Sequence, residues 1–226
     1  MLGALGGWAA SALATSASYP NFDSPTGLSV NADAEIKSGK LLVTPGEEGM
    51  TGTAFSEAKL VRPKQSFNTR FVLKVTPTSG QGGDGMAFVI QQAGAEEVGE
   101  GGGALGYGGL GPGLAVEFDH FTNFEHGDPD REHVALTLGG QPGNQVKVEP
   151  FKLSDKKVRA WVSYSAEKGR IKVFATRGKA KPAKPLFASN QDLDEILEGG
   201  RAYAGFSAGT GSETAAHKVF SWHFDG

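Results

Sequence analysis

Apolar and polar residues alternate with a period of two along much of the chain, and this alternation constrains the fold more than any other feature. Phe71, Leu73 and Val75 fall on one face of an extended strand. Val72 and Lys74 fall on the other face. Three further segments have the same pattern, and the residues of their apolar faces are Val158, Ala160, Val162 and Tyr164; Ile171, Val173 and Ala175; and Phe220, Trp222 and Phe224. The alternation predicts strands with one buried face.

The segments between these patterns point to a fold built almost entirely from short strands. Residues 86–90 form an apolar run that is typical of a strand buried on both sides. Residues 165–169 end in glycine and predict a turn that joins two strands into a hairpin. Helical periodicity is confined to residues 193–197, and Gly199 would end that helix. Many short strands separated by turn residues indicate a sandwich or a barrel.

Charge and composition exclude several classes of protein. A length of 226 residues fits one large all-β domain. The net charge of −3 gives no electrostatic sign of binding to nucleic acid or anionic membranes, and the nearest approach to a basic run, residues 179–184, is interrupted by Pro182. The chain has no cysteine, which rules out disulfides and zinc–thiolate sites. No segment approaches the ~20 consecutive apolar residues of a membrane span, which argues against membrane insertion.

The first eighteen residues differ from the rest of the chain. Residues 1–18 contain no charged side chain and end in small residues, as a secretory signal does, although the usual basic start is missing. A truncated or disordered leader is the alternative interpretation. We therefore expect a leader over residues 1–18, one domain over residues 19–226, and a secreted, extracellular protein.

An acidic strand followed by a polar loop is the most informative segment. Glu117 and Asp119 are two residues apart, so both carboxylates point to the same face of a strand. A loop marked by Gly127 and Pro129 follows. Three polar residues lie in or after this loop, namely Asn123, Asp128 and His133. A strand end and a loop can gather such side chains around a cation.

The side chains of this segment suit two different ions. Calcium prefers oxygen ligands, and the oxygen donors here are Asp119, Asn123, Asp128 and the main-chain carbonyl of Phe121. Manganese accepts a carboxylate-rich set with one imidazole, which is available from Glu117, Asp119, Asp128 and His133. A solvated acidic loop that holds no ion is the alternative, and the ligand types alone leave it open.

At these spacings the segment resembles the metal-binding loop of the legume-type (L-type) lectins, the family of concanavalin A. The family pattern is Glu-x-Asp-x-aromatic-x-Asn, then Asp-Pro, then His. Five other segments resemble the family in the same order along the chain: residues 21–28, 82–90, 102–106, 185–193 and 203–224. The resemblance implies an all-β, concanavalin A-like jelly-roll β-sandwich of antiparallel sheets, and it places the opening strand at residues 21–23 and 27–28.

The resemblance also implies a sugar site and its residues. Asp84, after a cis peptide bond, would accept hydrogen bonds from two sugar hydroxyls. Gly103 would donate its backbone N–H, and Asn123 would contact both calcium and the sugar. Phe121 would pack its ring against the apolar face of the sugar, and Ser212 lies where members of the family vary their specificity contacts. The implied activity is calcium- and manganese-dependent carbohydrate binding without catalysis.

Other interpretations remain open at this stage. Asp84 could be a turn residue, Phe121 could belong to the core, and a structural or adhesion domain could keep the ions without binding sugar. A glycoside hydrolase of the same fold would need a second glutamate where this chain has Phe121 and Thr122. Residues 141–155 depart from the family because they are short and offer no polar support for a manganese-bound water. The family often forms homodimers, but the sequence identifies no edge for pairing.

Overall fold

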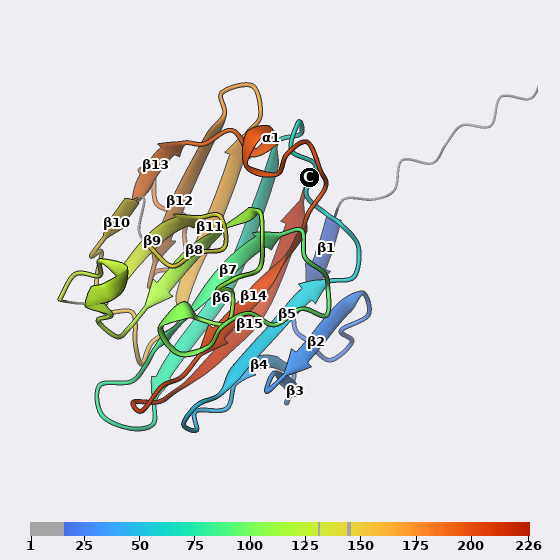
Figure 1. The fold of residues 1–226 in the computed structure, drawn as a ribbon. Coiled ribbons are helices and arrows are strands. Elements are labelled where there is room, and N and C mark those ends of the chain that lie inside the picture. Colours follow the sequence, from blue (N-terminus) through green and yellow to red (C-terminus); the bar gives the residue numbers. More distant parts are fainter. Residues whose placement is uncertain (1–15, 131, 144–145) are drawn as a thin grey trace, which may run out of the picture.

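The computed structural model describes residues 16–130, 132–143 and 146–226, and within them the chain forms a sandwich of two antiparallel sheets (Figure 1). One sheet, called the back sheet here, has the order β13-β12-β11-β6-β15-β4-β3, with β1 paired to β15. The other, the front sheet, has the order β10-β9-β8-β7-β14-β5-β2. The predicted all-β sandwich is confirmed.

The elements have the following bounds. The back sheet contains β1 (Ser16–Tyr19), β3 (Glu35–Lys37), β4 (Lys40–Thr44), β6 (Phe67–Pro77), β11 (Val158–Ser165), β12 (Arg170–Thr176), β13 (Phe187–Asn190) and β15 (Ala215–Asp225). The front sheet contains β2 (Leu28–Ala32), β5 (Thr51–Ser56), β7 (Gly85–Gln91), β8 (Gly113–Asp119), β9 (His133–Leu138), β10 (Val146–Val148) and β14 (Tyr203–Gly209). The short helices are η1 (Gly102–Ala104), η2 (Phe124–His126) and α1 (Leu193–Ile196).

The core lies between the two sheets and follows the predicted alternation. In β6 and β11 every second residue is buried, as the sequence pattern predicted. All residues of β7 are buried, since the core covers one face and the loop that holds η1 packs on the other. β11 and β12 pair as the predicted hairpin. In α1, the side chain of Asp192 accepts a hydrogen bond from the backbone of Asp194 at 2.9 Å, which caps the predicted helix.

The prediction for the last strand was wrong at one position. Phe220 was expected on the buried face with Trp222 and Phe224, but Val219 occupies the core and Phe220 is half-exposed. The register against β6 shifts between Val219 and Ser221, and such a bulge reverses the side-chain alternation that precedes it. Phe220 instead packs beneath the ammonium group of a lysine.

The beginning of the domain also differs from the expectation. Of the residues expected in the opening strand, 21–23 form a bend and Leu28 begins β2, whereas the first strand of the described chain is β1. Most of the expected leader, residues 1–15, lies outside the described residues. Its last three residues, 16–18, belong to β1 and pair with β15, so they are part of the folded domain. Within the described residues, none of the helices has the length and apolar character needed to cross a membrane.

Candidate functional site

The pairing of three central strands in the front sheet gathers the candidate residues at one edge. Asp119, the last residue of β8, lies opposite Gly85 of β7 on one side. On its other side it lies opposite His133, the first residue of β9. The turn before β7 contains Asp84, so it reaches the same edge as the loop between β8 and β9.

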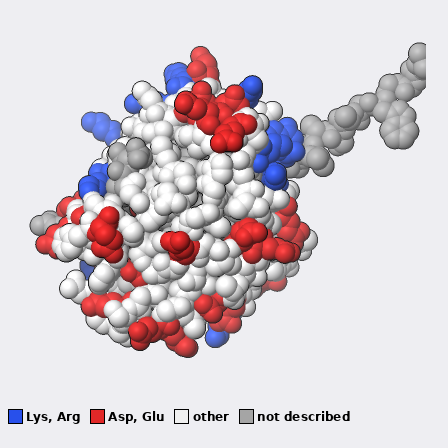
Figure 2. Space-filling view, viewed as in Figure 1, with Lys and Arg blue, Asp and Glu red and all other residues white. Residues whose placement is uncertain are grey.

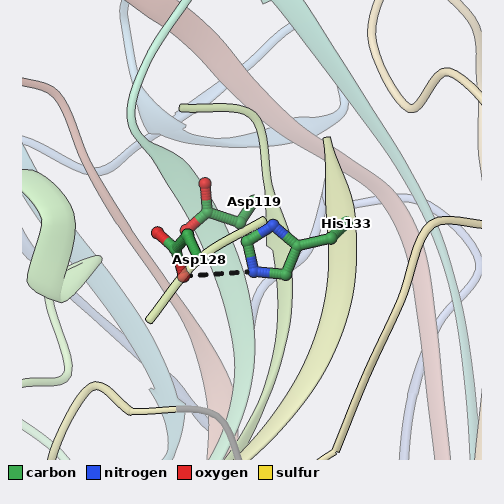
Figure 3. Close-up of side chains that lie close together, drawn as sticks. All are labelled: Asp119, Asp128 and His133. Atoms are coloured by element: carbon green, nitrogen blue, oxygen red, sulfur yellow. Dashed lines mark ion pairs between the residues drawn. The ribbon is translucent and has the colours of Figure 1, made fainter. Parts of the chain in front are cut away.

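Three of the predicted ligands form one cluster. The ligand atoms of Asp119, Asp128 and His133 all lie within 4.8 Å of one another (Figure 3). Nε2 of His133 lies 3.4 Å from Oδ1 of Asp128. The backbone N–H of Asn123 donates to Oδ2 of Asp128 at 2.9 Å, and that of Phe121 donates to Oδ1 of Asp119 at the same distance. The backbone of the loop therefore holds both carboxylates in place.

The carboxylates of this cluster are buried together, which is costly without a cation. Burial, and then the neighbouring charges of Glu117 and Asp128, raise the pKa of Asp119 well above its usual value. Burial raises the pKa of Glu117 to about 7. A divalent cation would offset this repulsion. Oδ1 of Asn123 is buried without a hydrogen-bond partner, which is suited to a cation ligand, and the oxygen-rich donor set fits calcium.

Glu117 has a partner that the sequence analysis missed. The hydroxyl of Tyr107, on the loop after η1, donates a hydrogen bond to Oε1 of Glu117, and both side chains are buried. The hydroxyl of Thr137 in turn donates to Tyr107 at 3.1 Å. Glu117 is not in the cluster of three ligands. These two hydroxyls supply polar support beside the predicted manganese ligand, and they lie outside residues 141–155, where such support was expected and not found.

Asp84 is buried at the same edge of the sheet. The peptide bond between Gly83 and Asp84 is cis, as the resemblance implied. The backbone carbonyl of Asp84 accepts hydrogen bonds from the N–H groups of His120 and Phe121 at 2.9 and 3.1 Å. The turn that carries Asp84 is therefore joined directly to the start of the loop between β8 and β9.

The carboxylate of Asp84 faces both the loop and the end of β14. Its side chain is only 4% exposed, and Oδ2 has no hydrogen-bond partner. Burial raises the pKa of Asp84 to about 6, while the backbone of Gly211 and the amide of Asn123 act in the opposite direction. The arrangement leaves a buried acceptor oxygen next to an amide and a backbone N–H.

Gly103 and Asn123 are in close contact. A β-carbon at Gly103 would lie 2.6 Å from Nδ2 of Asn123, which is closer than real β-carbons approach other atoms. A β-carbon at Gly211 would lie 3.1 Å from Oδ2 of Asp84. Glycine backbone therefore forms two sides of the space around Asn123 and Asp84.

The remaining candidates lie at the rim of this space. Phe121 is half-buried and does not belong to the core clusters. Ser212 is exposed on the loop between β14 and β15. The next residue, Glu213, accepts a hydrogen bond from the backbone of Gln81 at 2.7 Å, which ties this loop to the turn that carries Asp84. Phe124 in η2 is 73% exposed and was not singled out from the sequence.

Two histidines behind the site were also not assigned a role. His120 and His217 are buried, and their ring centroids lie 6.3 Å apart. Nδ1 of His217 lies 2.6 Å from the hydroxyl of Thr44. Burial lowers the pKa of both histidines. Both are buried side chains, and only tertiary structure brings them together.

Comparison with known proteins gives a consistent result. The family profile described as "Legume lectin domain" matches residues 14–226. The L-type lectin-domain containing receptor kinase S.7 of Oryza sativa subsp. japonica is 30% identical, and the match covers 94% of this chain and 35% of the relative. The L-type lectin-domain containing receptor kinase IV.2 of Arabidopsis thaliana is 29% identical, with 91% and 34% covered. The chain thus spans about a third of the length of these relatives.

Solved structures share the fold. The lectin from Bauhinia forficata in complex with GalNAc has a TM-score of 0.79 at 24% identity, with 92% of this chain and 96% of that chain covered. Peanut lectin, solved with a nine-residue peptide, has a TM-score of 0.78 at 25% identity, with 92% and 95% covered. The sandwich and its connections are therefore those of these plant lectins.

Proposed function

This chain belongs to the legume lectin domain family, and from that membership we propose that its domain binds a sugar ring in a calcium- and manganese-dependent way. Members of the family are carbohydrate-binding lectins without catalytic activity, and the neighbours in fold are lectins. The dependence on metal ions, the residues that contact the sugar and the kind of sugar are the parts that we propose.

The observation that carries the proposal is the environment of Asp84. This carboxylate is buried, and its Oδ2 lacks a protein partner beside Asn123 and the glycine backbone. A buried acceptor is costly to leave unpaired, and sugar hydroxyls are suitable donors. The proposal is that two hydroxyls of one sugar ring donate to the carboxylate of Asp84.

The surrounding residues would orient the ring. The backbone N–H of Gly103 would donate to a sugar oxygen, since no side chain blocks the approach. The amide nitrogen of Asn123 would donate to a hydroxyl while its Oδ1 faces the cation. The ring of Phe121, half-exposed at the rim, would pack against the apolar C–H face of the sugar. Ser212 would contact substituents that distinguish one sugar from another.

Two cations would hold this arrangement. The ligands proposed for calcium are Asp119, Asn123, Asp128 and the carbonyl of Phe121, and those proposed for manganese are Glu117, Asp119, Asp128 and His133. When bound, the cations neutralise the buried carboxylates and fix the loop that carries Phe121 and Asn123. Asp119 and Asp128 belong to both sets, so the two sites are expected to fill cooperatively.

Two other functions, that of a glycoside hydrolase and that of a structural domain, fit the site less well. A hydrolase would need a second carboxylate along the strand of Glu117, but Phe121 and Thr122 follow there and the family is not catalytic. A domain that kept its ions only for structure would not need the free acceptor of Asp84. The lectin proposal accounts for that acceptor directly.

The relatives also suggest where the domain acts. They are named as receptor kinases, and this chain spans about a third of their length. We propose an extracellular position for the domain, as expected for a lectin that meets polysaccharides and glycoproteins outside the cell.

A glycan array followed by calorimetry tests the proposed function. The protein should bind a subset of glycans, lose binding after dialysis against a chelator, and regain it when calcium and manganese are restored. Binding that is unchanged by chelation, or no binding to any glycan by the metal-loaded protein, would contradict the proposal. Release of reducing ends would identify a hydrolase instead.

A further inference from the structure

The outer face of the back sheet carries a set of side chains that the sugar site does not use. In β6 and β11 the residues facing the core are buried, so their neighbours point outward. Arg70 is exposed on this face, and Trp161 and Arg159 are partly exposed beside it. This face belongs to the back sheet, whereas Asp119 ends strand β8 of the front sheet and Asp84 directly precedes strand β7 of that sheet.

The strand registers arrange these side chains in a row across the sheet. Trp161 of β11 lies opposite Phe174 of β12 on one side and Arg70 of β6 on the other. Arg70 in turn lies opposite His223 of β15. Neighbouring strands are about 4.8 Å apart, so the row extends over roughly 15 Å. Nζ of Lys181 lies 4.1 Å from the ring centroid of Phe174 and adds a cation at the end of the row.

Two adjoining grooves follow this row. Their volumes are about 300 and 250 Å³, and both are lined by Arg70, Trp161 and His223. Arg159 lines the first groove and Lys181 the second. Among the described residues that line the two grooves, the one carboxylate is that of Asp225. The grooves are therefore basic, with aromatic rings between the cations.

The cations of the grooves are available to a ligand. No ion pair found within the described residues involves Arg70, Arg159 or Lys181. Arg159 donates to the carbonyl of Gly178 at 3.1 Å, which uses one of its donors and leaves the others. The basic face is unusual on a chain with a net charge of −3. The face covered by the β7–β8 loop carries mostly acidic side chains (Figure 2).

We propose that these grooves bind a linear acidic polysaccharide, a chain of uronic acid residues, at a site separate from the proposed metal-dependent sugar site. The indole of Trp161 offers a flat surface for the apolar face of a sugar ring. The guanidinium groups of Arg70 and Arg159 match the geometry of carboxylates and can bind each with two parallel hydrogen bonds.

The shape and charge of the face favour this partner over others. The grooves are shallow and continue across several strands, which suits a polymer better than a small molecule enclosed in a pocket. Nucleic acids and anionic membranes need broad basic surfaces, whereas the grooves present three spaced cations, those of Arg70, Arg159 and Lys181. A polyuronate requires only cations at intervals along the groove and a flat aromatic side chain, here Trp161, against which a sugar ring can stack.

Biolayer interferometry on immobilised sodium polygalacturonate tests this inference, with the fully methyl-esterified polymer as an uncharged control. The buffer contains EDTA, which prevents calcium from cross-linking the polymer and also inactivates the proposed metal-dependent site. The wild-type protein should bind the acidic polymer and not the ester, and binding should weaken as salt is raised. Substitution D84A should leave this binding unchanged, which separates the inference from the proposed function.

Matched variants assign the binding to the grooves. R70Q/R159Q should weaken binding by about tenfold or more, because two charge-assisted contacts are lost. K64Q/K168Q removes the same charge from exposed positions that do not line the grooves, and it should bind as the wild type does. W161A should also weaken binding, and W161F should restore part of it. Thermal unfolding of each variant checks that the domain is folded.

Several results would overturn the inference. These are equal binding of the two polymers, unchanged binding by R70Q/R159Q, or loss of binding to the same extent in K64Q/K168Q. Binding only to phosphatidylserine vesicles or to a DNA oligonucleotide would assign the face to another partner. A dimer in solution that R70Q/R159Q dissociates, without binding to polygalacturonate, would show that the face joins two copies of the chain.

Discussion

The hydroxyl of Tyr107, on the loop that packs over the front sheet, donates a hydrogen bond to Oε1 of Glu117 in strand β8, and both side chains are buried. The partner of this tyrosine on its other side is Thr137. The contact connects the glycine-rich loop after η1 to the strand that carries two of the proposed metal ligands. It gives the proposed manganese site a second layer of contacts that can be changed without altering any ligand.

Substitution Y107F should weaken manganese binding by about tenfold, because residues that support a ligand typically contribute that much to affinity. Calcium affinity should change much less, since Glu117 belongs only to the proposed manganese set. Titration of each ion into the metal-free protein by calorimetry measures both affinities. Equal loss for the two ions would mean that Tyr107 acts on the fold of the site rather than on Glu117.

Substitution D84N should reduce sugar affinity by about a hundredfold or more, because a charged acceptor of two hydroxyls is lost in a buried position. The amide keeps the size of the carboxylate, and Asp84 is not a proposed ligand, so calcium affinity should be retained. Sugar binding is measured by calorimetry and calcium binding by competition with a fluorescent chelator. Normal glycan binding by D84N would place the sugar elsewhere.

Substitution D119A should remove both ions and the sugar together, since Asp119 belongs to both proposed metal sets. Elemental analysis of the purified variant should find neither calcium nor manganese. Its melting temperature should not rise when calcium is added, whereas that of the wild type should, because a bound ion stabilises the folded state. A variant that still binds one equivalent of calcium would refute the shared position of Asp119.

The stability of the metal-free protein should decrease as pH rises from 5 to 8. Burial raises the pKa of Glu117 to about 7 in the folded state, above its usual value of 4.5. A raised pKa contributes stability that is fully present below the unfolded value and is lost as pH rises through the folded value. Thermal unfolding in EDTA at several pH values measures this trend.

Metal ions should reverse that trend, because they bind the deprotonated carboxylates and compete with protons. With calcium and manganese present, the melting temperature should increase from pH 5 to pH 8, since affinity for the ions rises as Glu117 and Asp119 lose their protons. E117Q should flatten the slope in EDTA. The same slope in E117Q as in the wild type would assign the effect to other groups.

Alternation in the sequence predicted the strands wherever the local pattern and the burial agree. The burial of Phe71, Leu73 and Val75 was predicted correctly because a strand with one buried face has a side-chain period of two. The predicted burial of Phe220 was wrong because a bulge inserts one residue into the strand. The pattern of apolar residues in the sequence does not reveal such a bulge. The opening strand was predicted over residues 21–23 and 27–28, but a bend and a turn occupy residues 21–27, and the strand β2 begins only at Leu28.

The part of the candidate site that could be predicted is the part whose residues lie close together in the sequence. Asp119, Asp128 and His133 are near one another in sequence, and the spacing of their ligand types carries information about the loop. Tyr107 was missed because its contact with Glu117 depends on how a glycine-rich loop packs over the sheet. The row of Arg70, Trp161 and His223 was also missed, since it depends on the pairing of strands far apart in sequence.

Substitution G103A should weaken sugar binding by about tenfold or more and should weaken calcium binding less, because the atoms nearest the added methyl group all belong to Asn123, one of the four proposed calcium ligands. The added methyl group would lie 2.6 Å from Nδ2 of Asn123, so either the loop around η1 or the amide must move. The same β-carbon would lie 2.8 Å from Oδ1, so the amide would move as a whole, and Nδ2 and the backbone N–H of Gly103 could no longer converge on one sugar ring. G178A is the matched control, because its β-carbon would meet only the hydroxyl of Thr176 at 3.3 Å, away from the site. Calorimetry with the preferred glycan and with calcium separates the two effects, and a G103A variant that binds sugar as G178A does would show that the close contact between Gly103 and Asn123 is not used in recognition.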